Sequence, residues 1–110
     1  MRHKSVGIKL GAIETVLTVP SDKKAKLISL YISNIDPADH SASVYIQKDG
    51  SSDNVYLIKD ALIPTQAALQ AVSNEVFLEP DDTVVVETSS ADKLDCFLSY
   101  YEIRVHPGFL

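Results

Sequence analysis

The residues best suited to metal binding in this sequence are its three histidines, His3, His40 and His106. A zinc site needs about three or four ligands that converge on one point, and these ligands often come as closely spaced pairs. The histidines instead fall near one end of the chain, in a polar stretch in the middle, and near the other end. This spacing predicts three exposed histidines and no metal site, with a cluster between subunits as the alternative.

The single cysteine, Cys96, is the next candidate for chemistry. A reactive thiolate needs positively charged neighbours, whereas Cys96 follows Asp95 and precedes Phe97 and Leu98. We interpret it as a small buried apolar residue. Because one cysteine cannot form an internal disulfide, the fold does not depend on an oxidising compartment.

Other catalytic patterns are also missing from the sequence. The paired acids Asp81 and Asp82 lack the D-x-D-x-D-G spacing of a calcium loop, so we interpret them as solvated acids of a turn. No serine stands in the G-x-S-x-G context of a nucleophile elbow. Neither Gly7 nor Gly11 begins a phosphate-binding loop that leads into a helix. The sequence therefore predicts a protein that is not an enzyme and needs no cofactor.

The charge balance argues against nucleic acid as a partner. The chain carries 15 acidic and 10 basic residues, for a net charge of −5, whereas phosphate binding needs a basic face. The exception is the start of the chain, where Arg2, Lys4 and Lys9 occur with no acid among them. We interpret residues 1–12 as an arm outside the domain. A solvated terminus is favoured over a basic arm that reaches an acidic neighbour.

Short strands are the elements that must position these side chains. Period-two alternation of apolar and polar residues, interrupted by turn residues, is typical of half-buried strands. Residues 61–73 are ambiguous, and we favour a strand or irregular structure there over a short helix. The other predicted strands are residues 14–19, 24–34, 41–48, 55–59, 75–78, 83–88 and 94–105. The side chains expected to point inward are Ile28, Leu30, Ile32, Val44, Ile46, Val84 and Val86.

This pattern predicts an all-β fold, a single antiparallel β-sandwich of about seven or eight strands over residues 13–105. A jelly-roll-like and an immunoglobulin-like arrangement are both compatible with it. We expect residues 106–110 to be a C-terminal tail outside this domain. We see no signal peptide and no membrane span, so we expect a protein made and kept in a cytoplasm, with no membrane partner.

All five tyrosines fall in predicted strands, and exposed aromatic side chains can serve interfaces or bind sugars. Tyr31 and Tyr45 would lie on the face opposite Ile28 and Val44. That face is either a second packed layer or a partner surface, and packing is the favoured reading.

Three stretches of the chain resemble motifs of small virion proteins of tailed bacteriophages. Residues 18–34 are similar to their Thr-Val-Pro turn, which leads into a strand ending in Ser-Asn. Residues 76–84 resemble their Leu-x-x-Gly-Asp turn, although Asp81 stands where glycine is usual. Residues 98–103 are similar to their closing Ser-Tyr-x-Glu-Ile strand. The resemblance carries no catalytic residue.

The resemblance implies a non-enzymatic structural subunit of a virion, of the neck, tail or capsid-decoration type. Such a subunit would be made in the host cytoplasm, form a homo-oligomer and contact other virion proteins. The expected interface residues are Arg2, Lys4, Lys9, Tyr31, Tyr45, Phe109 and Leu110, with the last two filling a neighbour's pocket. The alternative is a β-sandwich that binds a ligand, such as a carbohydrate-binding module.

Overall fold

The computed structural model describes residues 1–105, and within them it contains nine strands and no helix. The expectations for His106, Phe109 and Leu110 therefore lie outside the described residues. The strands are β1 (Arg2–Lys9), β2 (Ile13–Thr18), β3 (Lys23–Asn34), β4 (His40–Gln47), β5 (Val55–Ile63), β6 (Ala68–Val72), β7 (Val76–Leu78), β8 (Thr83–Thr88) and β9 (Leu94–Arg104).

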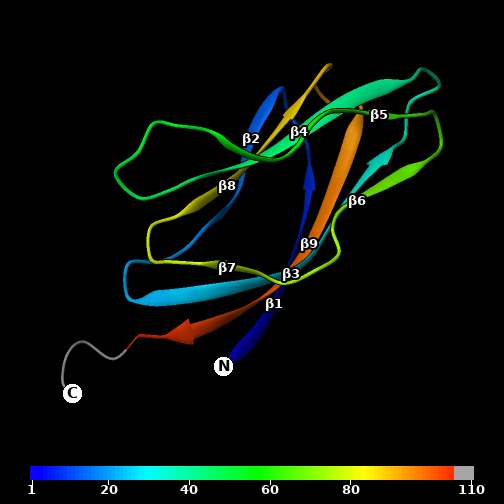
Figure 1. Ribbon diagram of the computed structural model, residues 1–110. Coiled ribbons are helices and arrows are strands. Elements are labelled where there is room, and N and C mark those ends of the chain that lie inside the picture. Colours follow the sequence, from blue (N-terminus) through cyan, green and yellow to red (C-terminus); the bar gives the residue numbers. More distant parts are fainter. Residues whose placement is uncertain (106–110) are drawn as a thin grey trace.

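The nine strands form two antiparallel sheets (Figure 1). The five-stranded sheet has the order β1-β9-β3, with the short strands β6 and β7 both paired to the free side of β3. The four-stranded sheet has the order β2-β8-β4-β5. The predicted all-β sandwich is confirmed, with nine strands rather than seven or eight. The preference for extended structure over residues 61–73 is also confirmed, because they hold the end of β5 and all of β6.

The prediction of an N-terminal arm over residues 1–12 is wrong for most of that segment. Strand β1 pairs along its whole length with β9, from Arg2 opposite Glu102 to Lys9 opposite Asp95. Figure 1 shows β1 (blue) alongside β9 (orange), although they come from opposite ends of the described chain. Leu10, directly after β1, is fully buried. The half-buried positions of β1 are Lys4, Val6 and Ile8, so only two of them are apolar and the sequence pattern did not reveal the strand.

A β-bulge in β3 changes which of its residues face the core. The register against β9 shifts between Leu27 and Ser29, so one extra residue is inserted at this point. Leu27 and Leu30 both become fully buried, while Ile28 is only half-buried. The expectation that Ile28 points inward is therefore wrong, because strict alternation does not survive a bulge. The expectation for Leu30 and Ile32 is confirmed.

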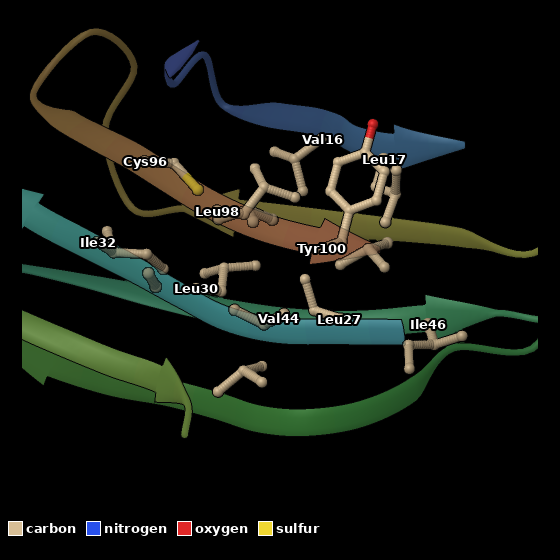
Figure 2. Packing of buried hydrophobic residues seen from close by; sticks show 14 of the residues in the cluster. Val16, Leu17, Leu27, Leu30, Ile32, Val44, Ile46, Cys96, Leu98 and Tyr100 are labelled. Carbon is tan, nitrogen blue, oxygen red and sulfur yellow. The ribbon is translucent and has the colours of Figure 1, made fainter. Parts of the chain in front are cut away.

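The core lies between the two sheets. Figure 2 shows side chains of β3 and β9 together with side chains of β2 and β4 in one cluster. Burying an aliphatic side chain of this size contributes about 1.5–3 kcal/mol, so the cluster is the main stabilising feature of the fold. The inward residues predicted in β4 and β8 are confirmed, and they are Val44, Ile46, Val84 and Val86.

Asp82 is a buried carboxylate, not the solvated acid expected from the sequence. Its side chain accepts hydrogen bonds from Lys48 Nζ at 2.5 Å, the Asp49 amide at 3.1 Å and the Glu79 amide at 2.8 Å. It thereby joins the turn between β7 and β8 to the start of the loop between β4 and β5. Its neighbour Asp81 is exposed, so for that residue the expectation is confirmed.

Loss of the Asp82 carboxylate is expected to destabilise the fold. Asp82→Asn leaves Lys48 and two amide donors without a charged acceptor, which costs about 2–4 kcal/mol of unfolding free energy. Urea unfolding followed by circular dichroism measures this loss. Asp22→Asn is the control, because Asp22 is exposed, and it should change stability by less than about 0.5 kcal/mol. Equal stability of the two variants would contradict the role given to Asp82.

The same carboxylate makes stability depend on pH. Burial raises the pKa of Asp82, but the hydrogen bonds from Lys48 and the two amides outweigh this, so its pKa lies below the usual value. Ionised Asp82 therefore stabilises the fold above about pH 4, and this contribution is lost as the pH falls through the lowered pKa. The stability gap between wild type and Asp82→Asn should be widest near neutral pH and shrink below about pH 4. A gap that stays constant down to about pH 2 would refute this.

Candidate protein-interaction surfaces

The outer side of the five-stranded sheet carries a group of exposed aromatic and apolar side chains. Tyr31 on β3 lies opposite Phe97 on β9, and they are 40% and 50% exposed. Both alternate with buried core residues, so the pleat of the two strands turns them toward solvent. We call this surface the aromatic face. Its exposed members are Tyr31, Phe77, Phe97 and Ile103, and Tyr101 beside them is half-buried.

His3 and Lys26 flank the ring of Tyr101 on the aromatic face. The ring of His3 on β1 packs at a tilt against Tyr101, with 5.2 Å between ring centroids. From the other side, Lys26 Nζ lies 5.4 Å from the Tyr101 ring centroid and 3.3 Å from Glu75 Oε2. Rings that are held in one orientation lose little conformational entropy when a partner binds, which favours recognition at this surface.

A hollow of about 370 Å³ lies beside Phe97 on the same side of the sheet. It exists because Gly7 on β1 has no side chain next to the Phe97 ring. Polar groups border it, since Ser33 contributes to the wall and Lys9 Nζ pairs with Asp95 Oδ1 at 2.8 Å. The aromatic face is therefore contoured, with a hydrophobic ring next to an ion pair.

Tyr45 lies on a different surface from Tyr31. It belongs to the outer side of the four-stranded sheet, where it is only 6% exposed and packs against Tyr56 with 5.1 Å between ring centroids. Burial raises the pKa of its hydroxyl, with smaller effects from Glu87 and Tyr56. The expectation of packing is confirmed for Tyr45. The expectation that the two tyrosines share a face is wrong, because their strands belong to opposite layers of the sandwich.

The structure brings together two of the three N-terminal bases. Arg2 and Lys4 lie on the same side of the sheet as Glu102, and Lys4 Nζ is 3.0 Å from Glu102 Oε1. Lys23 on β3 reaches the same oxygen at 3.4 Å. Lys9 lies apart from them, on the outer side with Asp95.

Glu102 is a site residue that sequence reasoning missed. It is only 6% exposed, and burial raises its pKa, but the two lysines outweigh burial and lower the pKa below its usual value. The available signal was its position in β9, because it continues the inward series Leu94, Cys96, Leu98 and Tyr100. A carboxylate in an inward position requires cationic partners.

The two histidines of the described residues, His3 and His40, lie apart, on β1 and at the start of β4. His3 is exposed, as expected, but His40 is half-buried, and its Nε2 lies 2.8 Å from Asp36 Oδ2. This pair joins the connection between β3 and β4 to the first residue of β4. Within residues 1–105, no three His, Cys, Asp or Glu side chains gather as a metal ion would require. No helix of this same part of the chain is long and apolar enough to cross a membrane.

Cys96 is buried, with 2% of its surface exposed, as the sequence predicted. Burial raises the pKa of its thiol to about 12. The folded protein is therefore expected to resist Ellman's reagent at about pH 8, and the guanidinium-unfolded protein to react at once with one equivalent. A rapid, stoichiometric reaction of the folded protein would contradict this.

Comparison with known proteins finds similarity in fold only. No protein-family model matches the sequence, and no curated protein matches it. A chain in the acidic stable capsid structure of Helicobacter pylori bacteriophage KHP30 is similar with a TM-score of 0.51 and 12% identity, over 94% of this chain and 91% of that one. A pentameric capsid protein isolated from metagenomic phage sequences also reaches 0.51, with 13% identity, over 99% of this chain and 67% of that one. This chain thus shares its sandwich fold with phage capsid proteins.

Proposed function

We propose that this chain is a non-enzymatic structural subunit of a tailed-phage virion. It self-associates and docks on capsid, neck or tail proteins, and it is made in the host cytoplasm before it joins the particle. The observation that carries the proposal is the aromatic face, an ordered apolar surface on a fold that phage capsid proteins share. The order of the three sequence motifs that resemble phage virion proteins supports the same role.

The aromatic face has the properties of an interface centre. Aromatic residues are enriched at protein interfaces, and a few well-placed ones supply most of the binding free energy. Tyr31 and Phe97 lie side by side within the ladder of the two longest strands, three residues from its Asn34–Leu94 end, and the two strands form a stiff support. Ion pairs such as Lys9–Asp95 and Lys26–Glu75 flank the exposed rings, as polar groups flank the core of many interfaces.

A carbohydrate-binding module is the second candidate. The observation that favours it is the hollow beside Phe97, where an exposed ring adjoins the hydroxyl of Ser33 and the Lys9–Asp95 pair. Sugars bind to such combinations of a flat ring and polar groups. Both candidate functions use the aromatic face. In the virion subunit a protein would cover it, and in the carbohydrate-binding module a sugar would.

Self-association through the aromatic face predicts an oligomer that depends on Tyr31 and Phe97. Native mass spectrometry and light scattering of the full chain should find a discrete oligomer at micromolar concentration. The double variant Tyr31→Ser/Phe97→Ser should raise the dissociation constant at least about tenfold, because it removes two central rings. Leu62→Ser is the control, since Leu62 is 65% exposed on the other sheet, and it should leave the oligomer intact.

The virion role has its own test. Mass spectrometry of purified particles of the phage that encodes this chain should detect it in stoichiometric amounts. Its absence from the particles would refute the virion role, whatever its oligomeric state. A monomer that binds sugars on a glycan array, and loses this binding in Tyr31→Ser/Phe97→Ser, would favour the second candidate.

A further inference from the structure

The two arginines differ from every lysine in their ionic contacts. All the lysines of the chain lie within 4 Å of an acidic oxygen, including weakly placed ones such as Lys59 at 3.8 Å from Asp60. Arg2 and Arg104 are the only arginines, and neither has an acidic partner among residues 1–105. In a chain of net charge −5, two guanidinium groups without an acidic partner in the described part of the chain are unexpected.

Both arginines line the same pocket. It has a volume of about 200 Å³, and Met1, Lys23 and Glu102 complete its wall. The register of three neighbouring strands creates it, because β9 places Glu102 opposite Arg2 on β1 and Arg104 opposite Lys23 on β3. Arg2 and Arg104 are both exposed, so their guanidinium groups are accessible from solvent.

Among residues 1–105, the one acid that lines this pocket is Glu102, and its charge is already compensated. Glu102 is buried, and its Oε1 forms ion pairs with Lys4 Nζ at 3.0 Å and with Lys23 Nζ at 3.4 Å. Two lysines therefore compensate the one carboxylate, and the positive charges of the two arginines are not needed for it. A guanidinium group presents a planar fork of donors that matches the two oxygens of a carboxylate or phosphate.

We propose that this pocket, bounded by Arg2, Lys23 and Arg104, is an oxyanion site that binds the carboxylates of an acidic segment of another polypeptide. A nucleic acid is disfavoured because its continuous phosphate backbone requires an extended basic surface. The cations here are confined to one small pocket in an acidic chain. This assignment rests on the ionic contacts alone and does not depend on the virion role.

A capped tetra-aspartate peptide, titrated in low-salt, phosphate-free buffer and followed by two-dimensional NMR, tests the proposal. The wild-type chain should bind it saturably, with the largest shifts in residues that line the pocket. The double variant Arg2→Gln/Arg104→Gln should bind at least about tenfold more weakly. The matched control is Lys24→Gln/Lys59→Gln, which removes the same charge from exposed lysines outside the pocket. It should change the affinity less than about twofold.

The variant Arg2→Lys/Arg104→Lys separates geometry from charge. It keeps both charges but loses the forks, so its affinity should fall between those of wild type and Arg2→Gln/Arg104→Gln. All variants should melt within a few degrees of wild type, because the two arginines have no acidic partner among residues 1–105. Absence of saturable binding, or equal weakening in the control, would overturn the proposal. Tighter, arginine-dependent binding of a thymidine oligonucleotide would overturn it in favour of a nucleic-acid site.

Discussion

The register between β3 and β9 is the constraint on which both surfaces of the five-stranded sheet depend. These two strands are the longest in the chain, and one antiparallel ladder pairs them from Lys23–Arg104 to Asn34–Leu94. The ladder sets Tyr31 against Phe97 on the outer side, and it sets Lys23 beside Arg104 at the pocket. Because side chains alternate across a strand, a slip by one residue would exchange the two sides. The aromatic face and the pocket bounded by Arg2, Lys23 and Arg104 therefore both depend on this pairing, and the pocket depends also on the pairing of β1 with β9.

The bulge near Ile28 is part of the same constraint. Without the extra residue, a single alternation would run through β3, and Leu27 and Leu30 could not both be buried. The bulge lets the strand keep apolar residues inward on both of its halves while Tyr31 remains outside. The core and the interface surface are therefore compatible within one strand.

Two buried carboxylates organise the ionic contacts of the molecule. Asp82 fixes the turn between β7 and β8 through Lys48 and two amides, and Glu102 holds Lys4 and Lys23 at the end of the five-stranded sheet. A buried carboxylate without a cationic partner would lower the free energy of unfolding. Asp82 is therefore paired with one lysine and Glu102 with two. Arg2 and Arg104 lie exposed and have no acidic partner among residues 1–105, so their charges are not used to compensate a buried carboxylate there.

Local patterns in the sequence were sufficient to predict the all-β fold, most of the strands and the inward residues of β4 and β8. They also indicated a buried Cys96 and a chain without a catalytic pattern, because alternation and turn residues are local properties. They were not sufficient for β1, the Ile28 bulge or the burial of Asp82 and Glu102. Each of these features depends on a partner distant in the sequence. Strand β1 forms only by pairing with β9, and Asp82 can be buried only because the Lys48 ammonium group and the Asp49 amide donate hydrogen bonds to it. The sequence by itself determined the class of fold, whereas long-range pairing in the tertiary structure decided which side chains share a surface.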